Sequence, residues 1–163
     1  TFDGLFSNRS REKILEIMRD SRVGTNAVLA IAGVLILNTA LLSNMDSSLI
    51  YTAVMLFPAA GRIGSLIGSG VSTYARTGEG LGKSFIDYCG WKEIAAGLAL
   101  SYVIFYLAAG VKGLVLCTAA AVFAFLLTKA FSKRIGGATG DILGAVCELN
   151  QTLFMIMLYL MRI

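Results

Sequence analysis

Long apolar runs separated by short polar segments make up most of this sequence. Five runs stand out, each with at most one internal charge: 23–45, 47–75, 94–111, 113–128 and 142–161. A helix needs about 20 mostly apolar residues to cross the hydrocarbon core of a bilayer. The pattern therefore predicts about five transmembrane helices joined by short polar connections.

The overall composition indicates the same class of protein. Of the 163 residues, 56% are hydrophobic and 15% are charged, whereas soluble domains are about 45–50% apolar and about 25% charged. We predict an all-α fold, a polytopic integral membrane helical bundle with a short amphipathic helix near its N-terminus. The chain is interpreted as a single membrane domain, 1–163, with a cytoplasmic amphipathic segment at 1–22 and the transmembrane bundle at 23–163.

Basic residues predict how the bundle is oriented, because Lys and Arg are enriched in cytoplasmic loops. Five lie within 9–22, three within 76–92 and three within 129–134, whereas Lys112 and Arg162 fall on the opposite side of a five-helix alternation. We therefore expect an integral membrane protein whose basic segments face the cytoplasm. The lipid bilayer is its expected partner, and a homo-oligomer is left open. The net charge of +4 follows from this topology, so no nucleic-acid partner is predicted.

Residue usage excludes several kinds of active site. The sequence contains no histidine, which rules out histidine metal ligands and Ser-His-Asp triads. Its three cysteines, Cys89, Cys117 and Cys147, show no CxxC spacing, and an odd number argues against a disulfide framework.

A glycine-rich stretch, RIGGATGDILGA at 134–145, separates the last two apolar runs. Gly136 is expected to cap the preceding helix in a left-handed conformation, and Thr139 or Asp141 to cap the following one. The remaining glycines exceed what capping requires. Free backbone N–H groups at a helix N-terminus favour a phosphate, and an aspartate favours a bridging cation. A phosphate or metal site is thus preferred over a plain connector.

The last predicted helix carries a polar face that extends below this stretch. Spacings of three and four residues place Asp141, Gly144 and Glu148 on one side of the helix, with Glu148 about two turns inside the membrane. Intramembrane charges usually face a partner or a wet cavity. Arg62 is the other intramembrane charge, so these two residues either form a structural pair or line a polar cavity open to the cytoplasm.

The segment SREKILEIMRDS at 10–21 has the pattern of an amphipathic helix. Its apolar face is formed by Ile14, Leu15 and Met18, and acids recur every four residues on another face: Glu12, Glu16 and Asp20. Acids at this spacing repel one another, a repulsion that solvent, nearby arginines or a divalent cation would relieve. Such a helix also suits the headgroup layer of a membrane.

Two further segments rich in glycine have simpler interpretations. GSLIGSG at 64–70 has the small-xxx-small spacing that lets transmembrane helices pack closely. Pro58 is expected to kink the second span, with neighbouring groups satisfying the freed carbonyl. ARTGEGLG at 75–82 is either a linker or a mobile flap over the site, and the sequence does not decide between them.

Two long motifs resemble those of a known family. FDGLFSNRSREKILEIMRDSRVGT at 2–25 and GGATGDILGAVCEL at 136–149 are similar, in this order, to motifs of the cobalamin-5′-phosphate synthases, also called adenosylcobinamide-GDP ribazoletransferases. The resemblance covers nearly the whole chain. It implies an integral enzyme of the prokaryotic cytoplasmic (inner) membrane, with its active face toward the cytoplasm, that completes the nucleotide loop of vitamin B12. Family members carry additional N-terminal membrane sequence, so we interpret the chain as part of a longer family domain.

The resemblance implies a Mg2+-dependent transfer between two small-molecule substrates, adenosylcobinamide-GDP and α-ribazole or its 5′-phosphate. The ribazole hydroxyl attacks the phosphate attached to cobinamide and GMP leaves, which gives adenosylcobalamin or its 5′-phosphate. Phosphoryl transfer depends mainly on positioning and charge neutralisation. Carboxylates that hold Mg2+ provide both without histidine.

Matching the family's motifs residue by residue assigns roles to positions of this sequence. Catalytic and metal-binding roles fall on three aspartates, with one glutamate as a further metal ligand: Asp3, Asp20, Asp141 and Glu16. Substrate-binding roles fall on eight positions: Gly4, Ser21, Gly24, Gly136, Gly137, Thr139, Gly140 and Gly144. The earlier aspartates of the family's first motif, DGxxDxxDG, would precede Thr1.

Two other functions remain as alternatives. A membrane phosphotransferase acting on CDP-alcohols also uses aspartate-rich motifs on membrane helices, but its pattern of Asp, Asp-Gly and Ala-Arg is incomplete here. A non-enzymatic transporter or channel subunit would use Arg62 and Glu148 as a polar pathway, and would leave the three cytoplasmic motifs unexplained.

Overall fold

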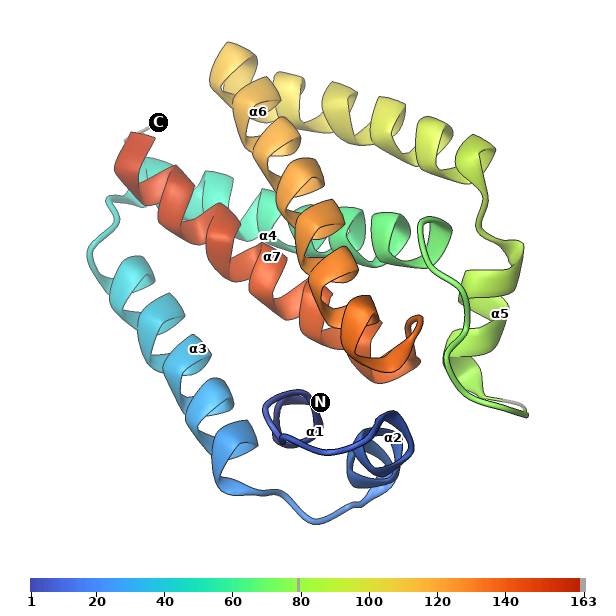
Figure 1. The fold of residues 1–163 in the computed structure, drawn as a ribbon. Helices are drawn as coiled ribbons and strands as arrows, with labels where there is room; N and C mark the ends of the chain where they lie inside the picture. The colour runs from blue at the N-terminus through green and yellow to red at the C-terminus, as the bar shows by residue number, and fades with distance from the viewer. Residues whose placement is uncertain (79, 162–163) are drawn as a thin grey trace.

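The computed structural model of the chain describes residues 1–78 and 80–161, and their arrangement is helical throughout (Figure 1). Arg162, which the orientation argument placed opposite the basic segments, lies outside the described residues. The described helices are, in order, α1 (Phe2–Leu5), α2 (Arg11–Arg19), α3 (Thr25–Ser43), α4 (Ser47–Gly70), α5 (Leu81–Tyr88), α6 (Trp91–Ile135) and α7 (Gly140–Met161).

Four of these helices, α3, α4, α6 and α7, are long and apolar enough to cross a membrane. The 45 residues of α6 are interrupted by non-helical backbone at Ala109 (φ −141°) and Gly110 (φ 57°). Figure 1 shows a sharp bend between the two halves of α6. Tyr102 Oη and Thr118 Oγ1, one from each half, are hydrogen-bonded at 2.9 Å. α6 therefore contains the third and fourth predicted runs. The predicted all-α polytopic membrane bundle is confirmed.

The core lies where α4 packs against α6 and α7. Gly64 and Gly68 face α7 so closely that an added Cβ would lie 3.1 Å and 2.9 Å from its atoms, as the small-xxx-small spacing predicted. Asn150 of α7 is fully buried, and its Nδ2 donates to the Ala60 carbonyl of α4 at 2.7 Å. Pro58 lies inside α4, which is helical on both sides of it.

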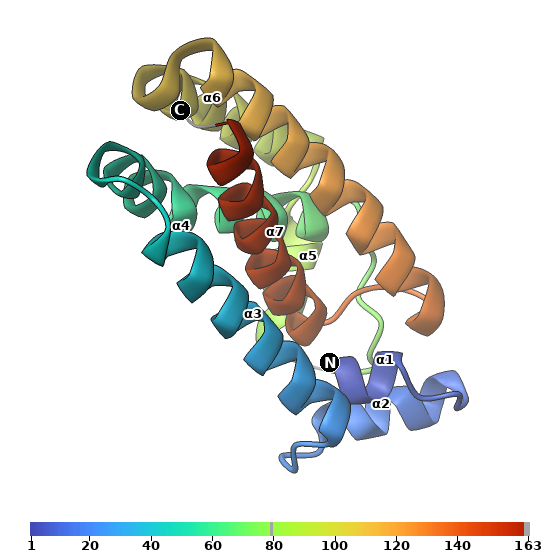
Figure 2. The same cartoon turned by 90° about the vertical axis from the view of Figure 1, so that its left-hand side faces the viewer.

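α3 lies at the edge of the bundle beside α7 (Figure 2). None of its residues is buried, although its sequence is strongly apolar. An apolar helix without a buried residue, which packs on the bundle along one side and exposes apolar side chains on the others, is suited to lipid rather than water. The chain is an integral membrane protein.

α2 lies across one end of the bundle, next to α1 (Figure 2). Its predicted apolar face is buried within the protein, with Ile14 at 2% and Met18 at 8% exposure. Arg11, at its first turn, donates from Nε to the Ile135 carbonyl at 2.7 Å and from Nη2 to the Ala75 carbonyl at 3.0 Å. The amphipathic helix is thus confirmed, and α6 and the α4–α5 loop hold it in place.

Candidate active site

Three polar segments that are distant in the sequence meet at this end of the bundle. The α4–α5 loop and the α6–α7 turn form a parallel bridge between Tyr74 and Ala138. Ala138 N donates to the Thr73 carbonyl at 2.8 Å, and Ala75 N donates to the Ala138 carbonyl at 2.9 Å. Arg11 of α2 binds the Ala75 carbonyl from the third segment. These hydrogen bonds join the α4–α5 loop, the α6–α7 turn and α2 at one end of the bundle.

The glycine-rich α6–α7 turn begins with the predicted helix cap. Its next residue packs more closely against a neighbouring segment than the sequence indicated. Gly136 has φ 70° and caps α6 in the left-handed conformation. Gly137 has φ 153°, and an added Cβ would overlap the backbone of the facing loop. Thr139 Oγ1 accepts a hydrogen bond from a first-turn N–H of α7 at 3.4 Å. Thr139 therefore caps α7, which leaves the Asp141 carboxylate available for other partners.

The Asp141 carboxylate is bound by a residue that the sequence identified only as a basic loop residue. Arg76 Nη2 donates to Asp141 Oδ2 at 2.6 Å, and the two side chains are 16% and 39% exposed. A pair with one largely buried partner is screened less than a surface pair. Thr1 Oγ1 donates to the Asp141 carbonyl at 3.0 Å. The first turn of α7 is thus tied to the α4–α5 loop and to α1.

A cavity of about 770 Å³ opens beside the Arg76–Asp141 pair. Two helices supply its polar walls, α7 through Gly140, Asp141, Gly144 and Glu148, and α4 through Arg62, Ser65 and Ser69. Arg62 and Glu148 are exposed, and among the described residues no ion pair joins them. The structural-pair alternative is therefore wrong. Both residues line one cavity, as the other alternative predicted, although apolar side chains such as Leu66 and Phe85 form part of its wall.

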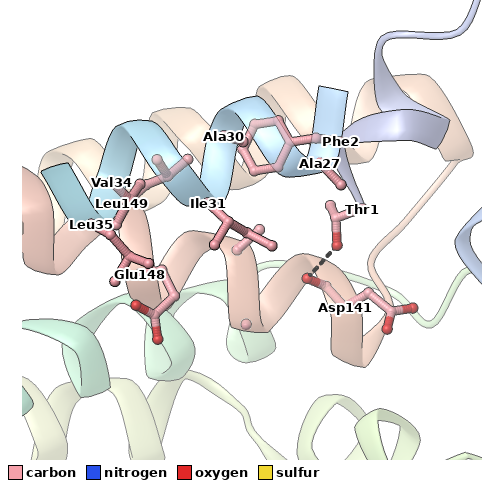
Figure 3. Close-up of a pocket in the computed structure, with 12 residues that line it drawn as sticks. Thr1, Phe2, Ala27, Ala30, Ile31, Val34, Leu35, Asp141, Glu148 and Leu149 are labelled. Carbon is pink, nitrogen blue, oxygen red and sulfur yellow. Dashed lines mark hydrogen bonds between the residues drawn. The ribbon is translucent and has the colours of Figure 1, made fainter. Parts of the chain in front are cut away.

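A second, mostly apolar pocket of about 370 Å³ lies between α3 and α7. Figure 3 shows α3 side chains such as Ile31 and Leu35 on one side, and Asp141 and Glu148 spaced along α7 on the other. Asp141, Gly144 and Glu148 border both pockets. The predicted polar face of the last helix therefore separates the cavity that contains the charged residues from a more apolar pocket.

The predicted site residues on α1 and at the start of α3 have structural partners of their own. The Asp3 carboxylate accepts hydrogen bonds from the backbone N–H groups of Gly24 at 2.8 Å and Ala27 at 3.1 Å, so it caps α3. A Cβ at Gly24 would lie 2.6 Å from Asp3 Oδ1, and one at Gly4 would lie 2.7 Å from Met18 Cγ. These contacts explain both glycines, and the roles of all three residues in binding or catalysis stay predictions.

The predicted site residues on α2 face solvent. Hydrogen bonds from the Arg22 guanidinium and backbone, reinforced by its charge, lower the pKa of the Asp20 carboxyl to about 2. Glu16 pairs with Lys13 at 2.7 Å, and Ser21 is exposed. Among residues 1–78 and 80–161, no three Asp, Glu or Cys side chains lie close enough to hold a metal ion. The four predicted ligands thus do not form one metal site here, and their metal roles stay predictions.

Three residues of the cavity were not predicted from the sequence. On α4, Ser65 and Ser69 follow Arg62 at helical spacing within an apolar run, and that periodicity was a usable signal. Arg76 had none, since its loop carries no pattern that predicts a partner on α7.

Comparison with known proteins gives a consistent result. Residues 1–159 match the family described as Cobalamin-5-phosphate synthase. A protein of Acetivibrio thermocellus named adenosylcobinamide-GDP ribazoletransferase is 60% identical over 162 residues, which cover 99% of this chain and 65% of the relative. Proteins of the same name are 55% identical in Clostridium acetobutylicum (98% of this chain, 63% of the relative) and 43% identical in Caldanaerobacter subterraneus subsp. tengcongensis (91% and 60%). The chain thus spans less than two thirds of the length of these relatives. No solved structure matches it.

Proposed function

This chain belongs to the cobalamin-5-phosphate synthase family, and we propose that it forms part of an enzyme that joins adenosylcobinamide-GDP to α-ribazole or its 5′-phosphate. The ribazole hydroxyl attacks the phosphate attached to cobinamide and loses its proton. The bond from that phosphate to the GMP oxygen breaks, and GMP leaves with the electron pair. The products are adenosylcobalamin, or its 5′-phosphate, and GMP. The name shared by the similar proteins supports the first substrate.

The observation that carries this proposal is the cavity of about 770 Å³ at the N-terminus of α7. Gly140 and Gly144 border it without side chains, so a ligand can approach the backbone closely. The N-terminus of a long helix favours an anion such as a diphosphate. The neighbouring apolar pocket would suit the less polar parts of the substrates.

We further propose that the transfer requires Mg2+. The cavity is bordered by the carboxylates of Asp141 and Glu148, which repel an anionic diphosphate unless a cation lies between them. Oxygen ligands of this kind suit Mg2+. Asp141 is the predicted metal ligand that borders the cavity, whereas Asp3, Glu16 and Asp20 keep that role as a prediction only.

We also propose that the protein lies in the prokaryotic cytoplasmic membrane with this cavity open to the cytoplasm. Basic side chains of three segments, such as Arg11, Arg76 and Arg134, bind partners at the same end of the bundle. Such clustering is typical of the cytoplasmic side.

The test is a membrane extract from cells that express the complete gene product. It should convert adenosylcobinamide-GDP and α-ribazole into a cobalamin and release GMP, and a chelator should abolish the reaction until Mg2+ is restored. Asp141→Asn should lower the rate by about 10²-fold or more without unfolding the protein, because Thr139 is the residue that caps α7. Synthesis of a phospholipid from a CDP-alcohol, with the corrinoid ignored, would instead establish the related phosphotransferase. A folded protein with neither reaction would favour the non-enzymatic alternative.

A further inference from the structure

The polar cavity has charged residues at two depths. Arg76 and Asp141 lie at the end where the loops meet, and Arg62 and Glu148 lie deeper along α4 and α7. Asp141 and Glu148 are seven residues apart on α7, which is about 10 Å along a helix at 1.5 Å per residue. The cavity therefore presents two guanidinium groups, one near its mouth and one further inside.

Arg62 is the deeper of the two and has no acidic partner. It lies within the membrane-spanning α4, and its side chain is exposed to the cavity. Among the described residues no carboxylate forms an ion pair with it. Arginines inside a membrane are costly and mark a ligand pathway or a partner. Without a direct ion pair, the Arg62 guanidinium is free to bind an anionic ligand that enters the cavity.

Arg76 has unused hydrogen-bonding capacity. Its guanidinium donates through Nη2 to Asp141, while its Nε is buried and has no hydrogen-bond partner. An arginine carries five N–H donors in a planar fork that matches the two oxygens of a phosphate. A buried donor without a partner costs free energy. A phosphate that drew the guanidinium away from Asp141 would therefore give this donor a partner.

We propose that Arg62 and Arg76 together bind the diphosphate of the nucleotide-linked substrate, and that Arg76 leaves Asp141 when it does so. This inference rests on the proposed function, which supplies a GDP-linked substrate. Ser65 and Ser69 lie on the same face of α4 as Arg62 and add hydroxyl donors between the two guanidinium groups. The exchange would release the Asp141 carboxylate at the moment the substrate arrives.

This exchange of partners has a consequence that separates it from a fixed structural pair. In the free protein, the Asp141 carboxylate competes with the diphosphate for Arg76. Removing the carboxylate charge should therefore strengthen diphosphate binding when no divalent cation is present, even though the same substitution lowers turnover. A carboxylate that only stabilises the fold would not produce such an improvement.

The test is equilibrium binding of GDP and of GMP to the detergent-purified protein in EDTA, which requires neither corrinoid nor α-ribazole. Arg62→Gln and Arg76→Gln should each weaken GDP binding by at least about tenfold and GMP binding by less. Asp141→Asn should tighten GDP binding by at least about threefold. Lys112→Gln is the matched control, because Lys112 is a cation that does not line the cavity, and this variant should bind GDP as the wild type does.

Each outcome separates this inference from the proposed function. Arginine-dependent GDP binding without any transfer would overturn the proposed function and leave the anion site in place. Wild-type affinity for GDP in both glutamine variants, or no GDP binding by the wild type, would overturn the anion site whatever the enzymatic activity. Weaker GDP binding by Asp141→Asn would overturn the exchange. If a glutamine variant does not fold, Arg62→Lys and Arg76→Lys replace it, and both should bind GDP with intermediate affinity, because lysine keeps the charge but not the fork.

Discussion

Replacing Gly82 by alanine tests whether α5 holds the mouth of the cavity in a fixed position. Gly82 lies in the first turn of α5 and is buried. A Cβ there would lie 2.5 Å from the backbone N of Gly140 and 2.7 Å from its Cα. Ordinary contact between heavy atoms needs about 3.5 Å, so the two backbones would have to separate by about 1 Å.

Two opposing effects determine how much stability this substitution costs. Alanine favours a helix over glycine by about 1 kcal/mol, whereas overpacking a well-packed contact costs about 1–3 kcal/mol. Overpacking should prevail, because the atoms in the way are backbone atoms of α7 and cannot rotate aside. The net loss should be at most about 2 kcal/mol, which is a few degrees in Tm for a domain of this size.

The effect on transfer should be larger than the effect on stability. Gly140 directly precedes Asp141, and a displacement of about 1 Å at a reacting site can cost about 10²-fold in rate. We therefore expect Gly82→Ala to lower the transfer rate by about this factor while Tm in detergent falls only slightly. Gly33→Ala in α3 is the matched control, since nothing lies within 4 Å of its added Cβ, and it should preserve both. A wild-type rate for Gly82→Ala would refute fixed packing and support the mobile-flap interpretation of 75–82.

Labelling of single introduced cysteines with a reagent that does not cross membranes tests the orientation. Cysteines at positions 10, 78 and 132 should be labelled from the cytoplasmic side, and cysteines at positions 46 and 112 from the opposite side. Labelling of position 78 from the outside would contradict the reasoning, because the motifs would then lie on different sides of the membrane. Asn150→Ala should destabilise the protein by about 1–3 kcal/mol in thermal unfolding, because it removes the buried hydrogen bond to the Ala60 carbonyl; an unchanged Tm would contradict this. Arg22 lowers the pKa of Asp20 to about 2 from 3.8, so the stabilisation from this pair is complete above pH 3.8 and is lost as the pH falls through about 2. The difference in Tm between the wild type and Asp20→Asn should therefore stay constant above pH 3.8 and disappear as the pH falls below about 2, and a difference that persists there would contradict this pairing.

The spans could be predicted because lipid imposes the same requirement along every crossing. The two halves of α6 correspond to the predicted runs 94–111 and 113–128. The bend lies at Ala109 and Gly110, slightly before Lys112, which separates the two runs. Gly113 lets the halves approach, since a Cβ there would overlap the Phe105 carbonyl. The second run extended too far. α4 ends at Gly70 because residues 73–75 pair with the α6–α7 turn, and no local pattern predicts a pairing across the fold.

The glycines also differ in whether neighbouring or distant parts of the sequence require them. Gly136 could be predicted because a helix end requires a left-handed residue within its own sequence. At Gly137 and Gly82, glycine is required for another reason, because the backbone of a distant segment lies too close for a side chain. Excess glycine in the motif indicated a close approach, and the structure identifies a protein backbone as one of the groups that approach.

The predicted carboxylates show why the site was harder to predict than the fold. Asp3, Asp20 and Asp141 were grouped because they occur in matching motifs, yet each has a different partner: the α3 backbone, Arg22 and Arg76. Arg76 and Asp141 are 65 positions apart, so no helical period relates them. Of the three, only Asp141 borders the polar cavity, and it is held there by a guanidinium with a free buried donor. A substitution at Asp3 should therefore act first through the N-terminus of α3, whereas one at Asp141 should act on ligand binding and turnover while the helices remain in place.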